Sequence, residues 1–383
     1  MRIILALIPA LLANMAIAQF DYCLGGRYGE QAIFDSSEVV VLEDIQYGNA
    51  THLFTGNEVD LMLDVWMPDP ALDTEIQRPM LLLIHGGSFM AGSRADMNYY
   101  CMEFARRGYV VATASYRLGW GCDPNAGIFT CLVCGPIAAQ VKTAAYCAVQ
   151  DVRAAMRYLA ANAEAFGGDP TQLFLGGDSA GAIATLHAAT VDQAEAEVYF
   201  APEIALAGGP DNSGNDLPIN YVVRGVINNC GAIFNTALLG GGEGVPVISF
   251  HDQFDCVVPY AGGNVLSCLG CSAFPYAQGS SSIHSWCAQN GVCTELNTLQ
   301  NSLLHCSWPA LNIIRRSACF MKRTLCGVCT SADNSNTNTY SPCMDLAWPQ
   351  EDPGICAADI NADGSVNAGD LLIFLSAYGL NCE

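Results

Sequence analysis

Basic residues are scarce in this sequence of 383 residues. It contains 15 lysines and arginines against 37 aspartates and glutamates, and only Lys142 and Lys322 are lysines. The formal net charge of −22 opposes binding to the phosphate backbone of nucleic acids and to anionic membrane surfaces. We therefore expect neither nucleic acid nor an anionic membrane surface as a partner.

Long apolar runs are lacking beyond the N-terminus, so the sequence predicts no membrane span. Residues 1–18 combine Arg2, a short apolar run and the small-residue site Ala16-Ile-Ala18 before Gln19, which is typical of a secretory signal peptide. A buried helix or a membrane anchor is the alternative, but the apolar run is short for a span. We expect cleavage after Ala18 and a secreted protein, extracellular or periplasmic.

Cysteine, in contrast, is abundant, with 19 residues that all follow residue 18. In an exported protein this number predicts disulfides, and the odd count leaves at least one thiol free or paired between chains. Pairs with Cys-x-x-Cys spacing would also suit a zinc site, although the expected oxidising compartment favours disulfides. There are three such pairs: Cys131/Cys134, Cys268/Cys271 and Cys326/Cys329.

Strand-like and helix-like segments alternate between residues 38 and 325. The runs 80–84 and 109–114 are continuously apolar, as in strands that are buried on both faces of a sheet. Such alternation predicts an α/β fold in which helices wrap a mostly parallel sheet. Further strands are expected at 39–42, 59–66, 173–175, 222–227, 245–250 and 295–299, and helices at 102–107, 141–165 and 313–325.

A Gly-x-Ser-x-Gly pattern occupies residues 177–181, between an apolar run and a helical pattern of small residues. This strand–turn–helix context is what a nucleophile elbow requires, because its tight turn excludes bulky neighbours. Gly177 and Gly181 meet that requirement. The pattern predicts Ser179 as a nucleophile, provided that the chain also supplies a base, an acid and an oxyanion hole.

The sequence His-Gly-Gly-Ser-Phe at 85–89 directly follows an apolar run. Backbone N–H groups in such a loop can stabilise the negative charge that develops on a carbonyl oxygen during acyl transfer. We expect these donors from Gly87 and Ser88, and from Ala180 after the nucleophile. An ordinary glycine turn is the alternative. His85 precedes the serine, whereas the base is expected after it. We therefore expect His85 to brace the loop by hydrogen bonding and not to act as the base.

The acid and the base are expected after the serine in the chain. Asp255, which is followed by Val-Val-Pro, is favoured as the acid over Asp252, which could instead cap its own turn. Of the six histidines, only His284 and His305 follow Asp255. His305 is favoured as the base because it lies between the last expected strand and the closing helix, whereas His284 continues an amphipathic pattern.

The motifs at 85–89 and 177–181, together with this order of nucleophile, acid and base, resemble the α/β-hydrolase carboxylesterases. The likeness is greatest to their hormone-sensitive-lipase-like and bacterial feruloyl-esterase-like branch, and it covers about residues 40–330. Two departures stand out: Ser88 replaces a usual third glycine, and 251–255 reads His-Asp-Gln-Phe-Asp in place of His-Gly-Thr-x-Asp. Three further stretches carry the likeness: 64–68, 116–119 and 150–157.

The resemblance implies an α/β-hydrolase fold and a secreted serine hydrolase that cleaves carboxylic esters through an acyl-enzyme, without a catalytic cofactor. The substrate would be a small-molecule or polymer-linked ester, with the acyl and alcohol groups left open. A non-catalytic adhesion or binding protein on the same scaffold is the second interpretation, since fold does not fix function. A serine peptidase is the third.

The composition changes near residue 330. We expect a catalytic domain at 19–330, a polar linker at 331–352 and a small module at 353–383. The stretch 359–370 places oxygen-bearing residues at loop positions 1, 3, 5, 7 and 12, and Gly364 at position 6, as in an EF-hand calcium loop. The predicted Ca²⁺ ligands are Asp359, Asn361, Asp363, Ser365 and Asp370.

Aspartate at the twelfth place of this loop resembles dockerin modules, although a dockerin carries two such repeats and this chain has one. The resemblance hints, by analogy, at association with a polysaccharide or a scaffold. An Asx-rich surface turn is the alternative for this segment.

Overall fold

The computed structural model describes residues 22–23, 25–120, 140–240, 244–269 and 272–335. The expected signal peptide at 1–18, the calcium loop at 359–370 and most of the expected linker lie outside the described residues. The chain divides into two compact units, and all elements named below belong to the unit Gly26–Cys343.

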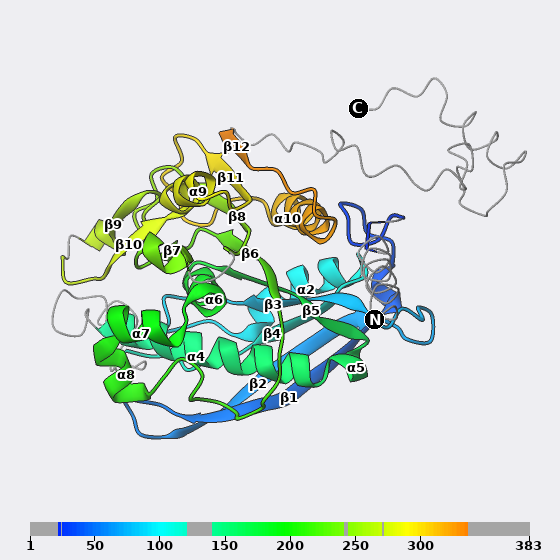
Figure 1. Cartoon of the computed structure of the whole chain (residues 1–383), viewed down its shortest axis with the longest axis horizontal. Helices are drawn as coiled ribbons and strands as arrows, with labels where there is room; N and C mark the ends of the chain where they lie inside the picture. Colours follow the sequence, from blue (N-terminus) through cyan, green and yellow to red (C-terminus); the bar gives the residue numbers. More distant parts are fainter. Residues whose placement is uncertain (1–21, 24, 121–139, 241–243, 270–271, 336–383) are drawn as a thin grey trace, which may run out of the picture. The chain divides into compact units, whose positions relative to one another are not determined.

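A nine-stranded sheet forms the centre of this unit (Figure 1). Among its described strands, β2 pairs antiparallel with both of its neighbours, β1 and β4, and every other pairing is parallel. The chain therefore has the mostly parallel sheet of the α/β-hydrolase fold, as the sequence predicts. The order is β1 (Val39–Thr51), β2 (Glu58–Pro68), β4 (Val110–Ala114), β3 (Arg78–Ile84), β5 (Gly168–Asp178), β6 (Val223–Asn229), β8 (Val247–Asp252), β11 (Thr294–Leu299) and β12 (Ala332–Ser335).

Strand β3 shows why the apolar runs become central strands. It lies between β4 and β5, and every one of its residues is buried. Its run 80–84 is apolar at each position because both faces of the strand are covered. At the edge of the sheet, β12 pairs in parallel with β11, so the sheet continues past residue 330, where the sequence predicts the catalytic domain to end.

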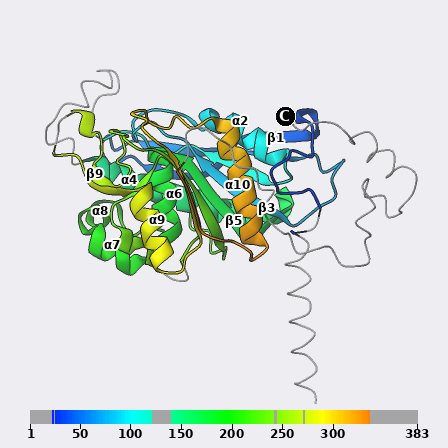
Figure 2. The ribbon, with the colours of Figure 1, turned by 90° about the horizontal axis from the view of Figure 1, so that it is seen from above.

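Helices cover the sheet (Figures 1 and 2). α2 (Asn98–Ala105) packs beside α10 (Ala310–Leu325), and α4 (Gln140–Ala161) packs beside α6 (Ala180–Thr190). No helix in the described ranges is both long and apolar enough to cross a membrane. The shorter helices are α5 (Ala163–Phe166), α7 (Gln193–Tyr199), α8 (Ala201–Ala207) and α9 (Ser280–Gln289), with 3-10 turns at η1 (Ser36–Glu38), η2 (Arg94–Met97), η5 (Thr236–Gly240) and η6 (Ser267–Leu269).

A second, three-stranded sheet lies outside the central one. Its order is β7 (Ala232–Ile233), β10 (Tyr276–Gly279) and β9 (Gly262–Asn264), with antiparallel pairing throughout. The sequence does not predict it, because strands of two to four residues are too short to carry a clear alternating pattern.

A buried ion pair ties the loop after β4 to helix α4. Arg117 Nη2 lies 2.7 Å from Asp151 Oδ1, and the backbone N–H of Arg117 donates to Asp151 Oδ2 at 2.8 Å. Gln150 accepts a further hydrogen bond from the same guanidinium. Removing either charge would leave its buried partner uncompensated. This explains why two of the stretches that carry the family resemblance, 116–119 and 150–157, contain these residues.

Disulfides form, as the cysteine content predicts. Cys268 and Cys329 each bond to a cysteine outside their own Cys-x-x-Cys pair, so these two sulfurs are not zinc ligands. Cys319 and Cys326 are also disulfide-bonded. The bonds described in full are Cys230–Cys306, Cys256–Cys268 and Cys293–Cys329, and the free thiols of the described chain are the buried Cys101, Cys147 and Cys287.

Candidate active site

Ser179 lies in the tight turn between β5 and α6. Its φ of 53° and ψ of −115° fall in a region that residues with side chains rarely adopt. A Cβ atom at Gly181 would collide with the carbonyl group of Ile84, and one at Gly177 would collide with the backbone of Gly181. The glycines of the motif are therefore required by the close approach of β3, β5 and α6 around the serine.

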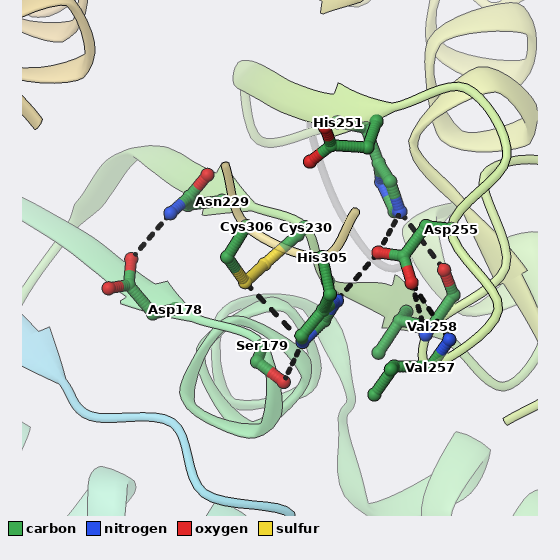
Figure 3. Close-up of a disulfide and its surroundings, with 12 residues drawn as sticks. Asp178, Ser179, Asn229, Cys230, His251, Asp255, Val257, Val258, His305 and Cys306 are labelled. Carbon is green, nitrogen blue, oxygen red and sulfur yellow. Dashed lines mark hydrogen bonds and ion pairs between the residues drawn. A yellow bond between two sulfur atoms is a disulfide. The ribbon is translucent and has the colours of Figure 1, made fainter. Parts of the chain in front are cut away.

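Ser179, His305 and Asp255 form a continuous hydrogen-bonded line (Figure 3). Ser179 Oγ lies 2.8 Å from Nε2 of His305, and Nδ1 of the same ring lies 2.6 Å from Asp255 Oδ2. Because a carboxylate only accepts, Nδ1 carries the hydrogen, and Nε2 of the neutral ring accepts from the serine hydroxyl. The three side chains are brought together from the segments that follow the parallel strands β5, β8 and β11.

The carboxylate of Asp255 is held by donors on both of its oxygens. Oδ1 accepts from the backbone N–H groups of Val257 and Val258 at 2.8 and 3.1 Å, and Oδ2 faces His305 and, at 3.4 Å, Nε2 of His251. Burial by itself raises the pKa of this carboxyl group, but the hydrogen bonds from the two histidines outweigh it and lower the pKa to about 2. Asp255 is therefore ionised at neutral pH.

The structure separates the two aspartates that the sequence leaves in competition. Asp252 is fully buried, and its carboxylate is hydrogen-bonded to Ser307 and not to the ring of His305. It accepts a hydrogen bond of 3.0 Å from the backbone N–H of Ser307 and a second from the Ser307 hydroxyl. Asp252 thus anchors the loop that carries the histidine.

The two candidate histidines also differ in place. His305 contacts Ser179, as described above. His284 lies in α9, as its amphipathic pattern suggests, and its Nδ1 is 3.2 Å from the hydroxyl oxygen of Thr294. The structure thus brings His305, and not His284, to the serine.

Of the three expected oxyanion-hole residues, Ser88 and Ala180 line the same cavity as Ser179, and Gly87 directly precedes Ser88. Gly87 adopts a φ of 110°, and a Cβ atom there would collide with the carbonyl oxygen of Ala91. Ser88 adopts a φ of 54°, which favours glycine and explains why a third glycine is usual at this place. In the described chain the N–H groups of Gly87 and Ser88 make no hydrogen bond. Ala180 occupies the first position of α6, where an N–H has no partner within the helix.

The oxyanion loop is braced from behind by aromatic rings. His85 is buried, and its ring stacks on that of Tyr116 at 4.5 Å between centroids. Its Nδ1 lies 2.8 Å from the carbonyl oxygen of Gly86, and burial lowers its pKa. Trp120 donates from its indole nitrogen to the Ser88 carbonyl at 2.8 Å. His85 therefore has the bracing contacts expected of it.

A small apolar cavity lies beside Ser179, with a volume of about 30 Å³. A single water needs about 10–15 Å³ of such space, so the cavity would hold only a few heavy atoms. Ser88 and Ala180 reach it, which places any group inside it next to the expected oxyanion donors. The apolar part of its wall includes Phe89, Trp120, Ile183, Phe234, Val265 and Leu266.

Sequence reasoning missed two groups in this site. One is His251, which contacts the carboxylate of Asp255. The other is the disulfide between Cys230, just after β6, and Cys306, whose Sγ lies 3.4 Å from His305 Nε2 (Figure 3). The adjacency of Cys306 to His305 in the chain was a usable signal, but its partner 76 residues away was not.

Residues 36–213 match the family model described as the carboxylesterase family. This segment contains Gly87, Ser88 and Ser179 but ends before Asp255 and His305. Gut esterase 1 of Caenorhabditis elegans is 36% identical over 115 residues, which cover 27% of this chain and 17% of that protein. Neuroligin-like protein glit-1 of the same organism is 31% identical over 129 residues, 34% of this chain and 16% of that protein. The chain thus spans less than a fifth of either relative.

The apo form of esterase 2 from Thermogutta terrifontis resembles the present structure with a TM-score of 0.50 at 17% identity. The likeness covers 79% of this chain and 100% of the esterase, and it concerns the fold. The finer assignment to a hormone-sensitive-lipase-like branch stays a prediction. The chain has the α/β-hydrolase fold, and its residues 36–213 match the carboxylesterase family.

Proposed function

We propose that this protein is a serine hydrolase that cleaves carboxylic esters through an acyl-enzyme. One observation carries the proposal: the hydrogen-bonded line from Ser179 through His305 to the ionised Asp255. Such a line supplies an activated nucleophile, a base and the group that orients the base. Similarity to the carboxylesterase family and to Gut esterase 1 supports the same chemistry.

The proposed reaction uses only groups of the chain and water. Ser179 Oγ attacks the ester carbonyl carbon while His305 Nε2 takes the hydroxyl proton. The N–H groups of Gly87, Ser88 and Ala180 stabilise the oxyanion of the tetrahedral intermediate, each by about 3–4 kcal/mol. His305 then gives the proton to the departing alcohol. Water, activated by the same ring, releases the acid and restores the serine.

The apolar cavity supports a short acyl group. Its volume of about 30 Å³ and its aliphatic and aromatic wall suit a short, uncharged acyl group. We therefore propose esters of small aliphatic acids, such as acetyl or propionyl esters, as the preferred substrates. The alcohol is not defined by this cavity.

A non-catalytic binding protein on the same fold is the second candidate, and the name of one relative, neuroligin-like, gives it some support. Against it stands the retention of serine, histidine and aspartate in mutual contact, because binding alone does not require a strained serine that is hydrogen-bonded to a histidine. Nothing in the described chain favours a peptidase over an esterase.

The test is turnover of p-nitrophenyl acetate by the wild-type protein and by Ser179→Ala, with His305→Ala and His284→Ala as a matched pair. We expect turnover in the wild type and in His284→Ala, and a loss of at least about 10³-fold in Ser179→Ala and His305→Ala. Full turnover in Ser179→Ala would refute the mechanism, and no turnover in the wild type would favour the binding protein.

We also propose that residues 359–370 bind Ca²⁺, on the support of their oxygen ligands and of Gly364 alone. Isothermal titration of the full chain with Ca²⁺ should give one binding event that Asp363→Ala abolishes. Heat that is unchanged in Asp363→Ala would exclude this loop.

Export to an oxidising compartment is proposed on the support of the disulfides and of the pattern at residues 1–18. N-terminal sequencing of the mature protein should then begin at Gln19. A mature protein that keeps residues 1–18 would contradict the proposed cleavage.

A further inference from the structure

The carboxylate of Asp255 has a second histidine against it. His251 lies near the end of β8 and is fully buried. Its Nε2 is 3.1 Å from the carbonyl oxygen of Val258 and 3.4 Å from Asp255 Oδ2, the same oxygen that faces His305 (Figure 3). The ester-hydrolysis mechanism proposed above gives this ring no role.

The partners of the His251 ring assign its tautomer. Both groups that face Nε2 only accept hydrogen bonds, so Nε2 carries a hydrogen that is shared between the Val258 carbonyl and Asp255. Nδ1 lies 2.7 Å from Ser280 Oγ. In the neutral ring, Nδ1 accepts from the hydroxyl of Ser280.

The hydroxyl of Ser280 is oriented in turn by Asn228. The side-chain amide of Asn228 donates to Ser280 Oγ at 3.0 Å and to Ser249 Oγ at 3.0 Å. Its oxygen accepts from the backbone N–H of Gly231 at 3.0 Å, so the direction of the amide is fixed. Because Ser280 Oγ accepts from Asn228, the Ser280 hydroxyl can donate its hydrogen to Nδ1 of His251.

The hydrogen bonds therefore all run in one direction: Asn228 donates to Ser280, Ser280 donates to His251, and His251 donates to Asp255. Asn228 lies in β6, Ser280 is the first residue of α9, and His251 lies in β8. All three are fully buried, and Asp255 lies in the loop after β8. A buried polar chain of this kind costs desolvation that apolar side chains would avoid, and it is stable only because each member is satisfied.

We propose that His251 is a positioning residue that holds Asp255 Oδ2 in line with Nδ1 of His305, while Ser280 and Asn228 hold His251 in the tautomer that can donate. The proposal rests on the ester hydrolysis proposed above, because it gives His251 a role only in a reaction that uses His305. During that reaction the His305 ring becomes charged and neutral in turn. His251 is a donor to Oδ2 that does not change, so the carboxylate keeps its orientation.

The test is a double-mutant cycle on p-nitrophenyl acetate hydrolysis. His251→Phe removes the donor, and we expect kcat to fall about tenfold, with KM within about twofold. In an Asp255→Asn background the same change should lower kcat by less than about twofold, because the group through which His251 acts is already altered. His251→Gln, whose amide N–H can lie near the former Nε2, should recover most of kcat.

Two results would overturn the proposal: a folded His251→Phe protein with the kcat of the wild type, or an equal loss of kcat in both backgrounds, which would indicate a merely structural role. Thermal unfolding shows whether each variant is folded. If His251→Phe does not fold, the same cycle is measured with Ser280→Ala in its place. We then expect kcat to fall about threefold when Asp255 is present and to stay unchanged in the Asp255→Asn background. Unchanged turnover in Ser179→Ala would instead overturn the proposed ester hydrolysis.

Discussion

Ser307 donates two hydrogen bonds to Asp252, one from its backbone N–H at 3.0 Å and one from its hydroxyl, and this contact anchors the loop that presents His305. The second fixed point of the loop is the disulfide between Cys306 and Cys230. The imidazole thus lies directly before two anchored residues. Its position depends on contacts that reach β6 and β8.

Substitutions of the two neighbouring aspartates, Asp252 and Asp255, should have different effects. Asp252→Ala removes the buried carboxylate that accepts from both donors of the partly buried Ser307, and we expect a loss of about 1–3 kcal/mol in the free energy of unfolding with a smaller effect on kcat. Asp255→Asn should keep the fold but lower kcat by about 10⁴-fold, because the histidine tautomer is no longer imposed. Urea unfolding and kcat for p-nitrophenyl acetate measure both. A larger kcat loss in Asp252→Ala than in Asp255→Asn would contradict the assignment of Asp255 as the acid and of Asp252 as the anchor of the loop.

On the acid side of the pH profile, kcat/KM should follow the titration of a single group. The pKa of Asp255 is lowered from 3.8 to about 2, against the effect of burial, by its histidine partners. It therefore stays ionised over the range in which an imidazole titrates, and log(kcat/KM) should fall with a slope of one below the break. A slope of two above pH 4 would show that Asp255 titrates together with His305.

The same pKa has a consequence for stability. A carboxyl group whose pKa is lower in the folded than in the unfolded chain stabilises the fold at pH values above its ordinary pKa. This contribution is lost as the pH falls from 3.8 to about 2. In Asp255→Asn that part of the acid destabilisation should disappear, which unfolding curves across this range would show. An unchanged dependence on pH would contradict the low pKa.

The Cys230–Cys306 disulfide should matter for turnover as well as for stability. The Cys230→Ser/Cys306→Ser protein loses the bond that fixes the residue after His305, and we expect a loss of about 2–5 kcal/mol in unfolding free energy together with a lower kcat. The matched control is Cys293→Ser/Cys329→Ser, which removes the bond beside the N-terminal ends of β11 and β12. It should lose stability but keep kcat. Equal kcat values in both proteins, each shown to be folded, would contradict the role in positioning.

Acyl preference should follow the size of the cavity. With about 30 Å³ beside Ser179, p-nitrophenyl acetate and propionate should be better substrates than the octanoate, as judged by kcat/KM. Leu266→Ala removes part of the wall and should raise the octanoate-to-acetate ratio about tenfold, the lower end of what a single methylene in an apolar pocket changes. Leu206→Ala, on the exposed surface of α8, is the control and should leave the ratio unchanged. A wild-type preference for octanoate would refute the short-acyl assignment.

The parts of the fold that the sequence predicts are those with strong local signals. Buried strands such as β3 appear as continuous apolar runs, and α10 appears as a long amphipathic pattern. Ser179 and the oxyanion loop are predictable because their chemistry requires glycines at fixed short spacings. The small sheet of β7, β9 and β10 leaves no such trace, since its strands are short and are held by tertiary contacts.

The histidine and the aspartate were harder to predict, because their partners lie far away in the chain. Position after a strand favours His305 over His284, but only the fold brings it 126 residues back to Ser179. Asp252 ends β8 and Asp255 lies three residues further on, and the partners of their side chains separate them. His251 opens the 251–255 motif, but the motif does not show that its ring contacts the carboxylate of Asp255. The partners that set its tautomer, Ser280 and Asn228, are far away in the sequence.

The most direct test of the central claim is covalent labelling of the nucleophile. The protein is incubated with a p-nitrophenyl alkylphosphonate, which an activated serine attacks with release of p-nitrophenol, and the adduct is located by peptide mass spectrometry. We expect one phosphonyl group per chain, on Ser179, and none in Ser179→Ala or His305→Ala. Release of p-nitrophenol with the label on another residue, or ester hydrolysis that persists in the fully labelled protein, would contradict the assignment of Ser179 as the nucleophile.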